Sequence, residues 1–370
     1  METKTLYHQI FDAVREDIEA GKYAAEQQLP TELELTKHYG VSRITVKRAL
    51  EELELHGYID RKQGSGSFVR SAGEWRASEC HERLHDTVAF ILPSFSANGL
   101  SQYIQGASEA MEKRGLHLSV HTTHENTVKE SELLRTLPKQ GMKGIIYYPT
   151  NSSFNIDVHT LHMNDYPIVT IDKHFEGPSA RSVVSDNYAG GYMAASHLAK
   201  LGHKRIAFVS SVGLEAASSV KHRYLGYSQA LKDNGLPCDA ELVLLDFLRE
   251  LGSLGSERSF KKIVEKLLSN QVTAVQAEND YVAVQLMKAA LELGAKVPDH
   301  LSVIGFDNSI ASAGAVVPLT TIEQPFRDIG RRAAEMIMNR LETGRTAESC
   351  VLPVTWIERG STSSLFTHHR

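Results

Sequence analysis

Residues 29–69 contain two short helical segments separated by a tight turn at Gly40 and followed by a glycine-tipped hairpin sequence. Thr31 and Glu34 match the capping box, which predicts a helix that begins at Thr31 and ends by Gly40. Ser42 is a suitable N-cap for the next helix. The positions of that helix which we expect to pack inward are apolar: Val46, Ala49, Leu50 and Leu53. With the amphipathic helix before it, this pattern predicts a winged helix-turn-helix in residues 1–70.

The outer face of the second of these helices is polar and basic, which suits contact with a DNA duplex. In a helix-turn-helix, the N-terminal residues of this helix reach base edges in the major groove. Arg43 can pair with guanine in bidentate fashion, and Lys47 can meet a base or a phosphate. Hydroxyl groups suit phosphate oxygens, and three are available: Thr31, Ser42 and Thr45. The alternative is a small structural domain with an ordinary charged face.

Charge supports the DNA interpretation only locally. The whole chain carries a formal charge of −5, whereas residues 37–70 hold seven basic and four acidic side chains, a net of +3. The basic side chains therefore concentrate where a phosphate backbone would lie.

The motifs Leu-Pro-Thr-Glu-x-Glu-Leu, Tyr-Gly-Val-Ser-Arg-x-Thr-Val and Gly-Ser-Gly-Ser-Phe-Val follow one another in residues 5–70. In this order they closely resemble the GntR family of bacterial regulators. The resemblance implies DNA contacts at five positions: Glu32, Arg43, Lys47, Gln63 and Gly64. Ile44 departs from the family pattern, since related proteins often carry a polar residue there. It either touches a thymine methyl group or makes no contact.

The whole chain has 370 residues, which is long for one domain and sufficient for two or three. Residues 71–86 lack periodicity and apolar runs and are expected to be a linker. Cys80, His81 and His85 lie there without the spacing of a zinc finger, so no metal and no cofactor is expected. Three distant cysteines fit a reducing compartment, and neither a signal segment nor a membrane-spanning run is recognisable, so we expect a cytoplasmic protein.

From residue 87 onward, short apolar runs alternate with amphipathic segments that end at a glycine. This alternation predicts an α/β architecture of parallel sheets with helices on both faces, and the length predicts two lobes. The expected strands lie in eight runs: 88–92, 116–120, 144–148, 168–171, 206–209, 242–245, 274–276 and 301–304.

Polar residues follow several of these runs, at the sheet edge where α/β proteins bind ligands. They are Asp172, Asp246 with Phe247, Asn279 with Asp280, and Asp307. Carboxylates accept paired hydrogen bonds from neighbouring hydroxyls, and an aromatic ring covers the apolar face of a sugar. Arg223, on an expected helix, could donate to ring or hydroxyl oxygens. Each aspartate could instead be a helix N-cap.

Five segments of residues 87–362 resemble the effector domain of the LacI/GalR family: Gly-His-Lys-Arg-Ile-Ala-Phe-Val, Arg-Tyr-Leu-Gly-Tyr, Ala-Glu-Asn-Asp-Tyr, Ser-Val-Ile-Gly-Phe-Asp-Asn and Pro-Leu-Thr-Thr-Ile. The resemblance implies one lobe from 87–185 and 311–347, and a second from 186–310 and 348–362. It also implies that Arg223 and Asp280 clamp the ligand, that Phe247 stacks on it, and that Ser94 and Asn98 line the pocket.

These resemblances imply a homodimeric repressor that binds operator DNA and is released by a small sugar. The pairing of this head with this body implies arabinose as the first effector to consider. Another sugar, a purine, or activation in place of repression remain alternatives. A sugar-binding protein of a transporter would need a signal segment and would have no use for the head. An enzyme is not expected, because the sequence holds no phosphate loop, no His-Glu-x-x-His and no Gly-x-Ser-x-Gly.

Overall fold

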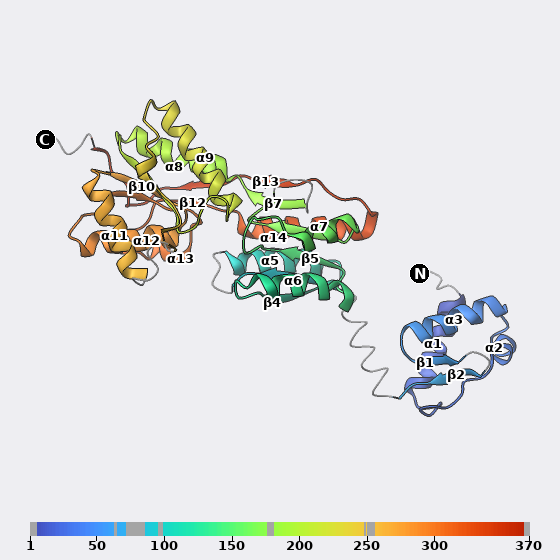
Figure 1. The fold of residues 1–370 in the computed structure, drawn as a ribbon. Helices are drawn as coiled ribbons and strands as arrows, with labels where there is room; N and C mark the ends of the chain where they lie inside the picture. The colour runs from blue at the N-terminus through green and yellow to red at the C-terminus, as the bar shows by residue number, and fades with distance from the viewer. Residues whose placement is uncertain are drawn as a thin grey trace. The chain divides into compact units, whose positions relative to one another are not determined.

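The structure is a computed structural model that describes residues 6–62, 65–71, 86–94, 99–175, 181–247, 249 and 256–365. It contains two compact units, one that extends to Asp86 and a larger one that begins at Thr87 (Figure 1). Three predicted contacts, Gln63, Gly64 and Asn98, lie outside the described residues, as do residues 72–85 of the expected linker.

In its described residues, the first unit holds three helices and a hairpin, as expected for a winged helix-turn-helix. The helices are α1 (Leu6–Glu19), α2 (Glu32–Tyr39) and α3 (Arg43–Leu55), and the hairpin pairs β1 (Ile59–Lys62) with β2 (Gly66–Val69) in antiparallel fashion. Apolar side chains of α1 pack against the inner face of α3, where Val46, Ala49, Leu50 and Leu53 are all buried. Gly40 adopts a left-handed conformation with φ of 66°, which ends α2 and makes the turn.

The second unit begins with a parallel six-stranded sheet in the order β13-β7-β6-β5-β3-β4. Its strands are β3 (Thr87–Leu92), β4 (His117–Thr122), β5 (Gly144–Tyr147), β6 (Ile168–Ile171), β7 (Arg181–Ser185) and β13 (Cys350–Leu352). Helices α5 (Leu100–Glu112) and α14 (Phe326–Thr343) pack on one face, and α6 (Thr127–Thr136), η1 (Pro138–Gln140) and α7 (Ile156–Met163) complete this lobe. Every residue of β3 is buried, because the sheet is covered on both faces.

A second parallel sheet has the order β11-β10-β8-β9. Its strands are β8 (Ile206–Val209), β9 (Val243–Leu244, after η2, Ala240–Leu242), β10 (Ala274–Ala277) and β11 (Ser302–Ile304). Helices α8 (Asn187–Lys200) and α9 (Ser218–Asp233) form the core on one face. Helices α11 (Ser256–Ser269) and α12 (Asp280–Glu292) form the core on the other. Figure 1 shows the two sheets as separate lobes of this unit.

The chain crosses between the lobes at places that differ from two of the predicted boundaries. After β7 it enters α8, and it stays in the second lobe through α13 (Ile310–Ala313) and β12 (Thr321–Glu323), which pairs with β14 (Thr355–Ile357). The prediction that 311–323 belongs to the first lobe is wrong, because backbone bridges join Thr320 to Ile304 and Glu323 to Asp307. Strand β13 pairs with β7 of the first lobe, so the last crossing also lies later than the predicted residue 348.

In each lobe one helix pair crosses at glycines, so closely that a side chain would not fit. In the second lobe, a Cβ at Gly191 of α8 would lie 2.8 Å from the Arg223 Cα of α9, and a Cβ at Gly226 would lie 2.7 Å from the Tyr192 backbone nitrogen. In the first lobe, Gly106 of α5 and Gly330 of α14 make the equivalent crossing. These contacts fix α9 on α8 and α14 on α5 with little freedom to slide.

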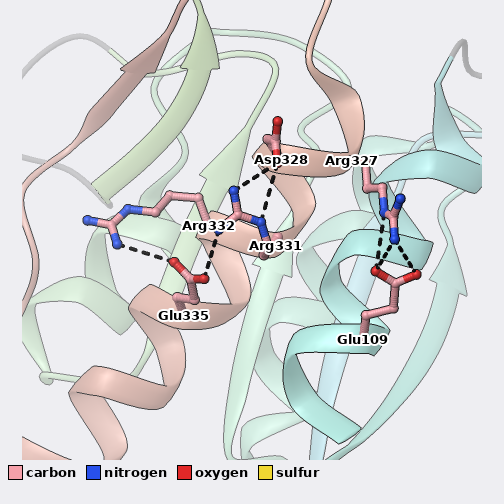
Figure 2. A network of polar contacts seen from close by, with 6 residues as sticks. All are labelled: Glu109, Arg327, Asp328, Arg331, Arg332 and Glu335. Atoms are coloured by element: carbon pink, nitrogen blue, oxygen red, sulfur yellow. Dashed lines mark hydrogen bonds and ion pairs between the residues drawn. The ribbon is translucent and has the colours of Figure 1, made fainter. Parts of the chain in front are cut away.

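Ion pairs extend the α5–α14 crossing to the surface (Figure 2). Arg327 reaches from the first turn of α14 to Glu109 of α5, with Nη2 at 2.8 Å from Oε1 and 2.6 Å from Oε2. Along α14 itself, Arg331 and Arg332 bind acidic neighbours one turn away, Asp328 and Glu335. The first turn of α14 is thereby held where Phe326, its first residue, faces the space between the lobes.

Candidate functional site

In the first unit, two of the hydroxyls predicted to contact phosphates, those of Thr31 and Ser42, act as helix N-caps. The Thr31 Oγ1 accepts from the Glu34 N–H at 3.3 Å, and the Thr31 N–H donates to the Glu34 Oε2 at 2.8 Å, so the predicted capping box is present. The Ser42 Oγ accepts from the Thr45 N–H at 3.2 Å and lies 2.8 Å from the Thr45 Oγ1. These caps set the angle at which α3 leaves the turn, and therefore where its first residues point.

The first residues of α3 are presented outward. The Arg43 side chain is 78% exposed, Lys47 is exposed, and Ile44 is 81% exposed although it is apolar. An isoleucine in this position offers the methyl surface that matches the C5-methyl group of thymine.

Glu32 organises the basic side chains of this surface. Its Oε2 accepts from the Arg43 Nε at 2.9 Å, and its Oε1 accepts from the Arg61 Nη2 of β1, also at 2.9 Å. The three side chains line one groove between the starts of α2 and α3 and the hairpin. Sequence reasoning included Glu32 as a contact but missed Arg61, because nothing in the spacing shows that a hairpin arginine folds back onto α2.

A cavity of about 770 Å³ lies between the two lobes of the second unit. It opens where the carboxyl ends of β5, β6, β8, β10 and β11 meet, as expected for parallel sheets. Its lining includes four of the predicted residues: Ser94, Asp172, Arg223 and Asp307.

Arg223 is a firmly held charge in this cavity. It is 4% exposed, its Nε donates to the Asn187 Oδ1 at 2.8 Å, and its Nη1 donates to the Glu278 carbonyl oxygen at 2.5 Å. Its guanidinium carbon lies 3.7 Å from the centre of the Phe306 ring, a cation–π contact. The side chain therefore enters the cavity preorganised, and a ligand oxygen meets a donor whose direction is already set.

The two predicted aspartates face this cavity from opposite lobes. Asp172 follows β6 and Asp307 follows β11, and both have positive φ, 64° and 119°. Non-glycine residues in such conformations cost about 1–3 kcal/mol and collect at ligand sites. Burial raises the pKa of the neighbouring Tyr148 well above its usual value, and both carboxylates add to the shift, so its hydroxyl stays protonated and can donate.

Two hydrogen-bond chains join the cavity to the first crossing between the lobes. The Gln324 Nε2 donates to the Asp307 Oδ1 at 2.6 Å, and its Oε1 accepts from the Ser185 Oγ at 2.6 Å. The Asn187 Nδ2 donates to the Ser185 carbonyl oxygen at 3.0 Å, while the same side chain holds Arg223. Where the chain leaves the first lobe, Ser185 is thus linked through Gln324 to Asp307, and Asn187 is bonded directly to Arg223.

Two predicted binding residues do not line the cavity. Asp280 is fully buried, and its carboxylate accepts from the Ser309 N–H at 2.7 Å and from the Thr321 Oγ1 at 2.5 Å. Burial raises its pKa, although the hydrogen bonds oppose the shift. Phe247 is also buried and packs edge-on against Phe260, 5.2 Å between ring centres, in the core of the second lobe. The roles of clamp and stacking ring predicted for them do not fit the structure.

Other residues lie at the cavity in the positions predicted for Asp280 and Phe247. Asn279 precedes Asp280 and lines the cavity, although its Oδ1 also caps α12 by accepting from the Val282 N–H at 2.9 Å. The aromatic rings at the cavity are Tyr148 and Phe326, from the first lobe, together with Tyr281. Asn279 stands beside Asp280 in the predicted sheet-edge motif, and the choice between the two could have been made from the sequence, because the residue before the first helical residue is the one whose side chain stays outside the helix.

The cavity chemistry suits a neutral ligand with many hydroxyl groups. It combines a rigid arginine, carboxylates, a tyrosine hydroxyl and a lysine, Lys173, whose pKa is lowered by burial and whose Nζ donates to the Pro149 and Thr150 carbonyl oxygens at 3.0 and 2.9 Å. Within the described ranges, no cluster of three potential metal-ligating side chains occurs. No helix in the same ranges has both the length and the apolar character needed to cross a membrane.

Comparison with known proteins gives two family matches. Residues 6–69 match the bacterial regulatory proteins of the gntR family, and residues 195–362 match the periplasmic binding protein-like domain. The chain is 28% identical to an arabinose metabolism transcriptional repressor of Geobacillus stearothermophilus, over 92% of this chain and 93% of that protein. It is 31% identical to the HTH-type transcriptional regulator DegA of Bacillus subtilis, over 76% of this chain and 82% of that one. A crystal structure of a LacI family transcriptional regulator from Enterococcus faecium with bound ribose matches with a TM-score of 0.64 at 25% identity, over 75% of this chain and 99% of that one.

Proposed function

Because the chain belongs to the bacterial regulators that join a gntR-family head to a LacI-like two-lobed body, we propose that it is a sugar-responsive transcriptional repressor. The observation that carries the proposal is the preorganised Arg223 in a polar cavity of the same chain whose head presents Arg43 and Lys47 outward. A regulator of operator DNA would act in the bacterial cytoplasm, and this role requires neither a catalytic group nor a cofactor.

We propose that the head reads the major groove with the start of α3. Arg43, once released from Glu32, would pair with a guanine, Ile44 would meet a thymine methyl, and Lys47 would bind a base or a phosphate. Thr31 and Ser42 would keep their capping bonds, in which the hydroxyl oxygen accepts a backbone N–H, while their hydroxyl protons and that of Thr45 turn to donate to phosphate oxygens.

We propose L-arabinose as the effector, because a relative matched over nearly the whole chain is named for arabinose metabolism. Arg223, Asp172 and Asp307 would bind its hydroxyls, with Asn279 in the clamping role that Asp280 cannot fill. A second sugar candidate is ribose, which the matched Enterococcus faecium structure holds. Both are pentoses, so the polar chemistry of the cavity suits either.

We propose that the working form is a homodimer. Large apolar side chains are exposed around α13: Ile310 at 95% and Val316 at 88% exposure. Such a surface is typical of a subunit interface. Two heads would then occupy the half-sites of a near-palindromic operator. Sugar binding between the lobes would favour a form whose heads no longer match that spacing.

The test is an operator titration with the full chain, using a duplex recovered by selection from genomic DNA. Allosteric coupling of about 1–3 kcal/mol corresponds to a loss of about five- to 150-fold in operator affinity on adding L-arabinose. Arg43→Ala should lose sequence-specific binding while sugar binding remains. If no pentose or hexose changes the operator affinity, regulation by sugar is refuted.

A further inference from the structure

Two loops of the first lobe contact the start of α9 in the second lobe. The Ser152 N–H donates to the Ala216 carbonyl oxygen at 2.9 Å, and the His174 N–H donates to the Ser218 Oγ at 2.9 Å. The His174 ring also stacks on the His222 ring, with 5.1 Å between centres. Helix α9 is therefore docked on the lobe opposite to the one in which it packs.

Helix α9 has no capping side chain of its own. Its N-cap position is occupied by Ala217, which makes no side-chain cap bond. A helix start leaves its first N–H groups without partners, and serine, threonine, asparagine and aspartate usually supply one. Here the Ser218 N–H donates to the Ser152 Oγ at 2.7 Å. The missing cap is thus provided by a residue of the first lobe.

The loop that carries Ser152 is braced on its own lobe. The buried Glu130 accepts from the Thr150 N–H at 3.2 Å and from the Thr150 Oγ1 at 2.6 Å. The Lys173 Nζ donates to the carbonyl oxygens of Pro149 and Thr150. Since these bonds fix the loop to the first lobe, the Ser152 hydroxyl can reach α9 only when the lobes approach each other.

We infer that Ser152 is a positioning residue which caps α9 across the gap between the lobes and so couples lobe closure to effector binding. The first two turns of α9 carry Ser219, Val220 and Arg223 into the cavity. Closure therefore completes the cap of the same helix that holds the ligand. This inference rests on the proposed function, because it assigns a regulatory contact to the proposed effector site.

The expected effect follows from the known cost of losing an N-cap. Truncation of a capping hydroxyl costs an amount that corresponds to about two- to thirty-fold in an equilibrium constant. Opening the lobes returns the Ser218 N–H to water, so the hydroxyl favours only the closed form. Ser152→Ala should therefore weaken sugar binding by that factor.

The experiment uses the full chain and three variants: Ser152→Ala, Ser152→Thr, which retains the hydroxyl, and Ser153→Ala, an exposed neighbour in the same loop. Calorimetric titration with L-arabinose measures affinity. Hydrogen exchange of the peptide that covers residues 216–220 measures protection of the start of α9, both without sugar and with saturating arabinose. Ser152→Ala should bind arabinose about two- to thirty-fold more weakly and exchange faster, whereas the other two variants should match the parent chain.

The two measurements separate failure of this inference from failure of the proposed function. Unchanged exchange in Ser152→Ala, or an equal effect of Ser153→Ala, overturns the cap. Faster exchange with unchanged arabinose affinity overturns its coupling to the effector site. If the parent chain does not bind arabinose, the proposed effector is wrong and the exchange result alone decides for or against the cap.

Discussion

Replacing Gly191 by alanine tests whether the α8–α9 crossing fixes Arg223 in the cavity. A Cβ at this position would lie 2.8 Å from the Arg223 Cα and would overlap the Arg223 carbonyl group. Carbon atoms in contact are normally about 3.5–4.0 Å apart, so the two helices must separate by roughly 1 Å. Because the obstacle is backbone, no change of rotamer can relieve it.

The magnitude is set by two opposing effects. Overpacking costs about 1–3 kcal/mol, whereas alanine in place of glycine favours a helix by about 1 kcal/mol. Because backbone must move, the upper end of the overpacking cost applies, which leaves a net loss of about 2 kcal/mol in the free energy of unfolding and lowers the melting temperature by roughly 4–8 °C. The displaced Arg223 would also lose its alignment with Asn187 and with the Glu278 carbonyl. Arabinose affinity should therefore fall by more than about tenfold, which is the effect of losing one hydrogen bond to a charged group.

Thermal unfolding and calorimetric titration measure both effects. Gly213→Ala is the matched control, since a Cβ there would meet no atom within 4 Å, and it should change stability by less than about 0.5 kcal/mol. A Gly191→Ala chain that melts with the parent and binds arabinose equally well would refute the idea that this crossing positions Arg223.

Three further predictions concern single side chains. Burial raises the folded-state pKa of Asp280, so its contribution to stability is present below the usual carboxyl pKa and is lost as the pH rises through the folded-state pKa. Asp280→Asn should therefore lose less stability than the parent chain as the pH rises through this window. Urea unfolding from about pH 3 to pH 7 measures the difference. Glu32→Gln frees Arg43 and Arg61 from their ion pairs, and fluorescence anisotropy should show tighter binding to any duplex and a salt dependence steeper by about one ion. Phe247→Leu should cost less than about 1.5 kcal/mol in unfolding free energy and leave arabinose affinity unchanged, whereas a large loss of affinity would restore Phe247 to the binding site.

Local signals in the sequence were sufficient for the head. The capping box at Thr31, the turn at Gly40 and the cap at Ser42 are each decided by neighbours within four residues, and the helices begin and end where these residues predict. The alternation of strand and helix in the body was equally visible. The position of Arg61 against Glu32 was not, because it depends on how the hairpin folds back over α2.

The cavity was only partly predictable, for a physical reason. Each polar residue after a strand lies near the ligand edge of the sheet, but the sequence does not show whether its side chain points into the cavity or back into the lobe. Asp280 turns back to Ser309 and Thr321, and Phe247 follows the edge strand β9 and packs into the core. Strand β12 was assigned to the wrong lobe because its pairing with β14 joins segments far apart in the sequence.

Ser185 and Asn187 carry a consequence for how effector preference can change. At the first crossing, Ser185 holds the Asp307 side chain through Gln324, and Asn187 holds the Arg223 side chain directly. Any rotation of the backbone at this crossing is therefore transmitted to the groups proposed to bind the sugar. Under the proposed function, selectivity among sugars can be altered by substitutions that never touch the ligand, and a search for variants with new inducers should include residues 185–187 as well as the cavity wall.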